Sequence, residues 1–287
     1  MKSVVLESYA KVNLFLDVLQ KFPDGYHELL TVFERVSLAD RVTVERVSGS
    51  GIGLECDAAG VPADETNLAV KAALAYRAAC GWSDGLRIML QKNIPAGGGM
   101  GGGSSNAAAV LLALDQLSGQ ALPRTALIEC ARELGADVAF FMEQTPFGIG
   151  RHRGDVIEPL AFPDTRLWHL LVTPEFPVPT KTVYQSLRLT PKHPDVKIIL
   201  GALEQRQIPR VQTLLYNALE PTVETLFPAI ARVKDRMMKD GGVSSPVVSG
   251  SGSTVFSVCA SEAEARQAAE RLQKLQPDWR IFAARTV

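Results

Sequence analysis

Residues 97–103 contain six glycines in seven positions and are the part of the sequence best suited to bind phosphate. A stretch of strand character, residues 86–90, precedes them, and a stretch of helical character, residues 107–114, follows. The first N–H groups of a helix lack intrahelical partners and carry the positive end of its dipole, and glycine lets the chain wrap closely around an anion. The hydroxyls of Ser104 and Ser105 could bond a phosphate oxygen, cap the helix or help to hold Mg²⁺. The pattern predicts an anion-binding loop.

Three other interpretations of these glycines are weaker. No lysine follows them, which excludes the Walker phosphate loop. The dinucleotide pattern GxGxxG fits at Gly97, Gly99 and Gly102, but a run this rich in glycine fits almost any such pattern. The acidic residue expected about 20 positions later would fall where a helix is still ending. A flexible linker is flanked by polar residues, whereas apolar stretches flank this run. A dinucleotide-dependent oxidoreductase therefore stays a minor alternative.

The elements that must position the loop predict a chain that mixes helices and strands. Residues 3–19 alternate apolar and polar residues in part, which predicts one or two strands, and Pro23-Asp24-Gly25 then forms a turn. Residues 32–47 have strand composition and predict a hairpin that turns near Ala39 and Asp40. Residues 136–160 predict a strand and a glycine-bearing turn. Apolar spacing predicts further helices, among them residues 66–81, 123–135, 211–226 and 261–275.

Composition excludes several classes of protein. The 287 residues carry 30 basic and 31 acidic side chains and no basic run, so nothing indicates binding to nucleic acid. The longest apolar run, residues 107–114, is far shorter than the ~20 residues that span a bilayer. The four cysteines are scattered and the four histidines show no ligand pairing, which argues against zinc and against a disulfide framework. These features predict a soluble cytoplasmic protein with free thiols.

Four stretches resemble the motifs of the GHMP kinases, the family of galacto-, homoserine, mevalonate and phosphomevalonate kinases. PAGGGMGGGSSNAA, residues 95–108, is similar to the phosphate loop of that family. The doubled glycine triplet before SSNAA resembles one branch, whose substrate is cytidine-diphospho-methylerythritol. The other matches follow in order and cover nearly the whole chain: AKVNLFLDV with DGYHELLTV, residues 10–18 and 24–32; LGADVAFF, residues 134–141; and SGSGSTVF, residues 249–256.

The resemblance implies an α+β fold of two domains. Residues 1–155 would form a ribosomal-S5-like ATP-binding domain, and residues 156–287 a ferredoxin-like α/β domain that contributes to the substrate site. It also implies ATP-dependent phosphorylation, with Mg²⁺, of the substrate's 2-hydroxyl in non-mevalonate isoprenoid precursor synthesis. The partner would be a small molecule, and a monomer or a homodimer fits equally. Two alternatives remain, another GHMP kinase of phosphomevalonate or homoserine type and a non-catalytic nucleotide-binding regulator.

The resemblance also implies roles for individual residues. Asp137 would accept the proton of the substrate hydroxyl, and Lys11 beside it would keep that carboxylate ionised. The ATP phosphate loop would consist of Pro95, Ala96, Gly97, Gly98, Gly99, Met100, Gly101, Gly102, Gly103, Ser104 and Ser105. The substrate would be bound by Asn13, Tyr26, His27, Thr180, Tyr184, Gly250, Ser251 and Gly252, with Tyr26 stacking on the cytosine and His27 reading its edge.

Without the resemblance, the same residues have ordinary explanations. Asp137 follows a glycine that ends a helix, where aspartate is usually a turn or cap residue, and a strand lysine such as Lys11 usually faces solvent. The chain also departs from the family pattern at several positions: Met100 replaces leucine, Ala139 replaces proline, Ala218 replaces aspartate, and GRHRGD, residues 150–155, is an unusual glycine-rich turn. None of these changes removes a residue assigned to chemistry.

Overall fold

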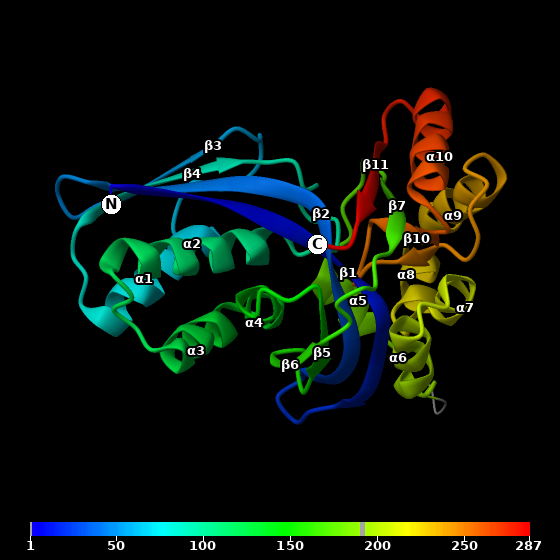
Figure 1. The fold of residues 1–287 in the computed structure, drawn as a ribbon, viewed down its shortest axis with the longest axis horizontal. Coiled ribbons are helices and arrows are strands. Elements are labelled where there is room, and N and C mark those ends of the chain that lie inside the picture. The colour runs from blue at the N-terminus through cyan, green and yellow to red at the C-terminus, as the bar shows by residue number, and fades with distance from the viewer. Residues whose placement is uncertain (1, 190–192) are drawn as a thin grey trace.

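Two β-sheets with their helices make up the computed structural model of the chain, which describes residues 2–189 and 193–287 (Figure 1). The first sheet is built on one long antiparallel pair, β1 (Ser3–Lys21) and β2 (His27–Val47). The remaining strands of the first sheet extend from this long pair (Figure 1): β3 (Ile52–Cys56), β4 (Gly85–Gln91), β5 (Phe147–Arg151), β6 (Val156–Leu160) and β8 (Tyr216–Asn217). The predicted α+β class is confirmed.

Four helices lie against the first sheet on one side: α1 (Leu68–Cys80), α2 (Gly102–Ser118), α3 (Arg124–Leu134) and α4 (Ala136–Met142). The central helix is α2, whose residues from Ser105 to Ala109 are all buried. Its alanine-rich face packs against β1. Each Å² of apolar surface buried there contributes roughly 25 cal/mol to the stability of the fold. Gly81 and Gly119 end α1 and α2 in the left-handed conformation, as their positions in the sequence predict. The sheet and α2 thus form a rigid base for the glycine loop.

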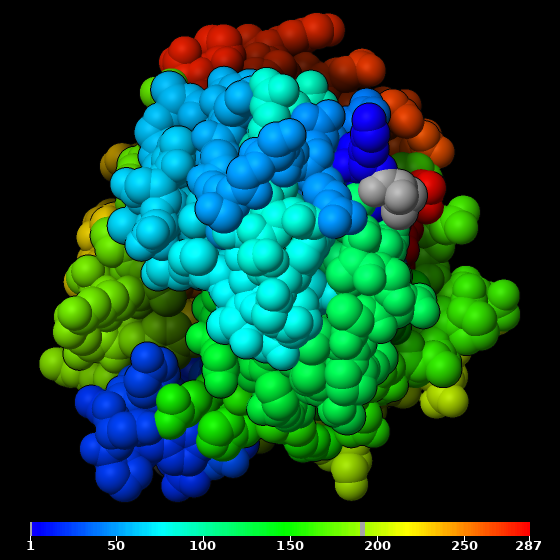
Figure 2. All heavy atoms as spheres, turned by 90° about the vertical axis from the view of Figure 1, so that its left-hand side faces the viewer, coloured from blue at the N-terminus to red at the C-terminus, as the bar shows by residue number. Residues whose placement is uncertain are grey.

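The second sheet has four antiparallel strands: β7 (Trp168–Thr173), β9 (Val247–Val248), β10 (Val255–Cys259) and β11 (Arg280–Arg285). Six helices accompany it: α5 (Thr180–Ser186), α6 (Val196–Glu204), α7 (Ile208–Leu214), α8 (Glu220–Leu226), α9 (Ala229–Lys239) and α10 (Glu262–Leu275). Figure 2 views the far end of the first sheet, where residues of the first half cover most of the face and the orange and red C-terminal segments show mainly along the upper edge.

The two halves are joined by more than one segment. The chain leaves the first sheet after β6 and enters the second at β7, and β8 returns to pair in parallel with Phe15 and Leu16 of β1. The boundary predicted at residue 155 lies in the turn between β5 and β6, and it stays a prediction. Shared pairing of this kind ties the second half to the strand that carries Lys11.

Two predicted elements are wrong. No hairpin forms near Ala39 and Asp40; β2 continues through them, and the register with β1 merely shifts there. The carboxylate of Asp40 accepts hydrogen bonds from the backbone N–H groups of Asn93 and Ile94 instead of making a turn. The single helix predicted over residues 211–226 is divided into α7, β8 and α8, because the sheet pairing of residues 216–217 interrupts it.

Candidate active site

The glycine loop lines a cavity of about 650 Å³ at the start of α2. Gly97, Gly99 and Gly101 have φ angles of 71°, 76° and 69°, a region that side-chain-bearing residues rarely adopt. Every residue of the predicted loop from Pro95 to Ser104 lines this cavity, whereas its last residue, Ser105, does not. The N–H groups at the start of α2 have no earlier helical partners, so this end of the cavity suits an anion.

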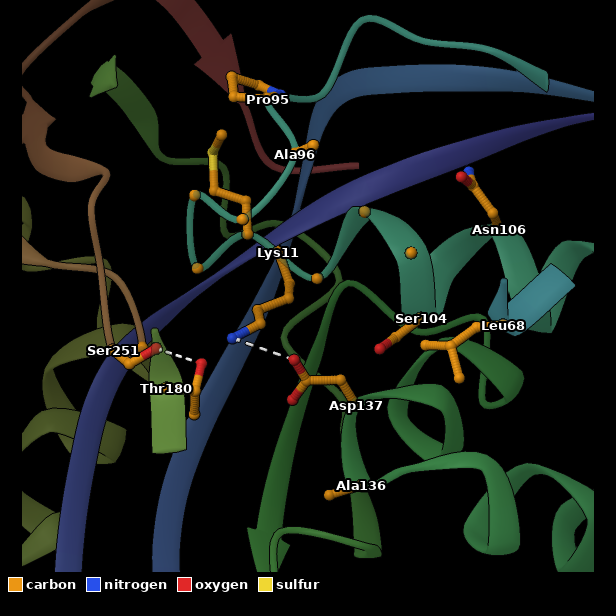
Figure 3. Close-up of a pocket in the computed structure, with 18 of the residues that line it drawn as sticks. Lys11, Leu68, Pro95, Ala96, Ser104, Asn106, Ala136, Asp137, Thr180 and Ser251 are labelled. Atoms are coloured by element: carbon orange, nitrogen blue, oxygen red, sulfur yellow. Dashed lines mark hydrogen bonds and ion pairs between the residues drawn. The ribbon is translucent and has the colours of Figure 1, made fainter. Parts of the chain in front are cut away.

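Lys11 and Asp137 meet beside the loop although they come from β1 and α4 (Figure 3). The Lys11 ammonium lies 3.4 Å from a carboxylate oxygen of Asp137 and donates a 2.8 Å hydrogen bond to the side-chain oxygen of Asn13. The Asn13 amide in turn donates to the Thr31 hydroxyl at 2.8 Å. Lys11 is nearly buried, whereas Asp137 is 30% exposed and lines the cavity. The carboxylate is thus held in place and open to a bound molecule.

Strand β1 also fixes the loop relative to this pair. The Lys11 backbone N–H donates a 3.0 Å hydrogen bond to the carbonyl of Met100. A Cβ on Gly101 would lie 3.0 Å from the Phe141 ring and 3.2 Å from Lys11 Cγ, so only glycine fits there without displacement. Ala139 is buried within α4. The position of Asp137 near the start of this short helix was not predicted, because no helix was predicted there.

A second turn, residues 249–254, packs against the glycine loop from the other half of the chain. The Thr254 N–H donates to the Gly98 carbonyl at 3.1 Å, and the Ser249 hydroxyl donates to the Gly99 carbonyl at 3.0 Å. Gly250 and Ser251 line the cavity, and the Ser251 hydroxyl lies 2.7 Å from that of Thr180 (Figure 3). Gly252 is outside the cavity lining and packs toward apolar side chains.

A second cavity of about 630 Å³ is lined by Tyr26 and His27, the residues predicted to bind the cytosine, and by Tyr184, which forms with His27 the aromatic pair of this cavity. The rings of His27 and Tyr184 lie 5.3 Å apart, and Tyr26 is exposed at the mouth. Burial, and then the positive charge of Lys21, lower the pKa of His27. Burial and the nearby charge of Asp137 raise the pKa of Tyr184. At neutral pH both side chains are therefore uncharged.

The two serines after the glycines have different surroundings. Ser104 lines the cavity and points toward the space beside Asp137 (Figure 3). Ser105 is buried, and its hydroxyl accepts a 2.7 Å hydrogen bond from Ser8, away from that cavity. Over residues 2–189 and 193–287, no three His, Cys, Asp or Glu side chains gather in a way that could hold a metal ion. A metal at this site would therefore depend on ligands other than a protein cluster.

A buried polar network behind the loop was missed by sequence reasoning. Asp40 is fully buried and pairs with the Lys92 ammonium, which also donates to Asn106 at 2.9 Å. The Asn106 amide donates to Asp40 and to Ser8, both at 2.9 Å. Lys92 also lines the far end of the cavity, together with Val61 and neighbouring residues. No local pattern could have revealed this network, because its members are far apart in the sequence.

Comparisons with known proteins agree with this geometry. The model of the GHMP kinases N terminal domain matches residues 67–145, and that of the GHMP kinases C terminal domain matches residues 199–278. A relative from Geobacter metallireducens, named 4-diphosphocytidyl-2-C-methyl-D-erythritol kinase, is 40% identical over all of both chains. The chain belongs to the GHMP kinase family. The resemblance inferred from the four motifs is thereby confirmed.

Other similar proteins support the same assignment of this GHMP kinase. A relative of the same name from Pelotomaculum thermopropionicum is 38% identical over 96% of each chain. The crystal structure of a 4-(cytidine 5'-diphospho)-2C-methyl-D-erythritol kinase is 39% identical, with a TM-score of 0.82 over 98% of each chain. A homoserine kinase from Cytophaga hutchinsonii, at 20% identity and a TM-score of 0.76, shares the fold.

None of the helices in the described ranges has the length and apolar character to cross a membrane.

Proposed function

We propose that this GHMP kinase transfers the γ-phosphoryl group of ATP to the 2-hydroxyl of 4-diphosphocytidyl-2-C-methyl-D-erythritol. The observation that carries the proposal is the position of Asp137, which lines the cavity of the glycine loop together with Lys11, while Tyr184 lines both this cavity and that of His27. A phosphate donor held by the loop and a cytosine held by the aromatic pair would place an alcohol beside this carboxylate. The names of the full-length relatives at about 40% identity give the same substrate.

In the proposed reaction, the Asp137 carboxylate accepts the proton of the 2-hydroxyl as its oxygen attacks the γ-phosphorus of ATP. The bond from that phosphorus to the oxygen bridging the β- and γ-phosphates breaks, and ADP leaves. Phosphoryl transfer needs mainly positioning and stabilisation of negative charge, which the amides of the loop and the start of α2 supply. The Lys11 ammonium, 3.4 Å from the carboxylate, holds it in position for the transfer.

The chain's donor set fits a magnesium ion held mostly by phosphate. Mg²⁺ in kinases usually keeps several waters and binds through few protein groups together with substrate phosphates. The protein groups that would hold the ion are the Ser104 hydroxyl and the Asp137 carboxylate, which both line the cavity. When bound there, Mg²⁺ would neutralise the charge on the β- and γ-phosphates. The requirement is testable by removing the metal with a chelator and restoring it.

The second cavity favours the cytidyl substrate over other alcohols. Mevalonate or homoserine kinases need no aromatic site for a base, and the neighbouring rings of His27 and Tyr184 would supply one here, with Tyr184 lining the same cavity as Asp137. Stacking is worth about 1–3 kcal/mol per base but accepts any base, so the hydrogen bonds of His27 must supply selectivity. The protein would act on this small molecule in the cytoplasm, as a monomer or a homodimer, without nucleic acid.

The decisive experiment offers the purified protein ATP and a panel of alcohols. We expect turnover with the cytidyl substrate and little with phosphomevalonate or homoserine. Turnover restricted to one of those alcohols would replace the named substrate with another of the family. ATP binding without phosphoryl transfer to any of them would favour a non-catalytic regulator, against which the intact pair of Lys11 and Asp137 argues.

A further inference from the structure

The unusual turn GRHRGD brings a cation to the substrate cavities. Arg153 lies between β5 and β6, in a turn whose His152 and Gly154 have φ angles of 60° and 86°. The Asp155 carboxylate accepts from the Arg153 N–H at 3.0 Å and lies 2.9 Å from His152 Nδ1. The His152 carbonyl accepts from the Leu29 N–H at 2.6 Å, so the turn is fastened to the start of β2.

Arg153 lies where the two cavities meet. Four residues line both the cavity of the glycine loop and the cavity of the aromatic pair: Leu29, Arg153, Thr180 and Tyr184. Arg153 is the charged member of this set. Its guanidinium lies 4.4 Å from the centre of the Tyr26 ring and pairs with Asp24, and its Nε atom is buried without a hydrogen-bond partner.

We propose that Arg153 binds the diphosphate of the substrate at this junction, an inference that rests on the proposed function. A molecule with its base at His27 and its reacting hydroxyl at Asp137 must pass its diphosphate through the space between the cavities. That diphosphate is anionic, and a guanidinium offers a planar set of donors that matches phosphate oxygens. The amides of the glycine loop are reserved in this arrangement for ATP.

The other cations near the cavities are less suited to this task. Lys11 is paired with Asp137 and bonded to Asn13, and Lys92 is paired with the buried Asp40. Lys21 and Lys181 line only the cavity of the aromatic pair and not that of the glycine loop. The Asp24 contact of Arg153 is between two half-exposed side chains, at 38% and 47% exposure, and such pairs are weak. The guanidinium can therefore turn toward a bound diphosphate at little cost while keeping its stacking on Tyr26.

The test compares ligands with and without a diphosphate. Dissociation constants of CDP and of cytidine are measured by calorimetry for the wild type, Arg153→Gln and Arg153→Lys, and the KM of the cytidyl substrate and of ATP by turnover. We expect Arg153→Gln to weaken CDP and raise the substrate KM by about tenfold or more, with cytidine and the KM of ATP nearly unchanged. The CDP affinity and the substrate KM of Arg153→Lys should lie between those of the wild type and Arg153→Gln, because lysine keeps the charge and loses the planar donors.

A matched control is Arg151→Gln, an exposed arginine two residues earlier that lines neither cavity. It should leave both affinities unchanged, and thermal melting checks that every variant folds. Equal weakening of CDP and cytidine in Arg153→Gln would overturn the inference, since Arg153 would then only support Tyr26. An unchanged CDP affinity would overturn it too. Absence of turnover in the wild type would instead overturn the proposed function and this inference with it.

Discussion

The ammonium of Lys11 lies 3.4 Å from the carboxylate of Asp137, and the two residues belong to a strand and a helix at distant places in the sequence. The lysine is nearly buried and the aspartate opens to the cavity of the glycine loop. A charge that cannot move away from a carboxylate facing bound substrate is well placed to control proton transfer. Under the proposed function, this pair would activate the alcohol in the same cavity that holds the phosphate donor.

Replacing Lys11 with methionine tests this relationship. We expect Lys11→Met to lower kcat by about 10²-fold or more, as loss of acid–base assistance does, with the KM of ATP nearly unchanged. Asp137→Asn should behave alike, and the double variant should lose little more because the two act as a unit. Steady-state kinetics measure these effects, with Lys71→Met on the exposed side of α1 as the control. Unchanged turnover in Lys11→Met would remove the assignment.

The contact between the two halves at Gly99 makes a second prediction. An added Cβ there would lie 2.2 Å from the Ser249 carbonyl oxygen, and the φ angle of 76° is already unfavourable for alanine. Gly49 has a φ angle of 89° with nothing within 4 Å, so Gly49→Ala reports the backbone strain alone, about 1–2 kcal/mol.

Gly99→Ala should therefore cost more than Gly49→Ala, by a further 1–3 kcal/mol or so from overpacking. It should also raise the KM of ATP, because the loop must shift to relieve the clash. Urea denaturation and steady-state kinetics measure the two effects. Equal stability losses in the two variants would contradict the close approach of the loop and the turn at residues 249–254.

The surroundings of His27 predict the pH dependence of substrate binding. Burial and the charge of Lys21 lower its pKa below the usual 6.5, so the imidazole is neutral at pH 7. The KM of the cytidyl substrate should stay constant down to about pH 6.5 and rise only in more acidic solution, where His27 gains a proton. Lys21→Gln removes one cause of the lowered pKa, so in this variant the rise in KM should begin at a higher pH. The same onset in both proteins would be inconsistent with this account.

Local chemistry explains why much of the site was predictable. The glycine loop, with Gly81 and Gly119 as helix ends, depends on backbone conformations that only glycine adopts easily, and these leave a mark in the sequence itself. Helix α10 was predicted, over residues 261–275, from the helical spacing of its apolar residues. The roles of Lys11 and Asp137 came from family resemblance and not from their immediate neighbours.

Roles that depend on distant partners could not be predicted. Strand β8 exists because residues 216–217 pair with Phe15 and Leu16, which the local helical spacing does not reveal. Helix α4 was missed because all but its first two residues are buried, so it lacks the alternation of polar and apolar residues by which helices are found. Asp40 resembled a turn residue, although its partners lie more than fifty positions away.

The buried pair of Asp40 and Lys92 makes the last prediction. Asp40→Ala leaves the Lys92 ammonium, only 7% exposed, without its carboxylate, so unfolding should become easier by about 3–5 kcal/mol. In Asp40→Ala/Lys92→Met the stranded charge is gone, and the double variant should be more stable than the sum of the single losses implies. Asp164→Ala removes the carboxylate of an exposed pair with Arg206 and should cost at most about 1 kcal/mol. Urea denaturation of the wild type, Asp40→Ala, Lys92→Met, the double variant and Asp164→Ala measures these losses. Additive losses in the double variant would show that Asp40 acts through the N–H groups of Asn93 and Ile94 and the amide of Asn106, and not through Lys92.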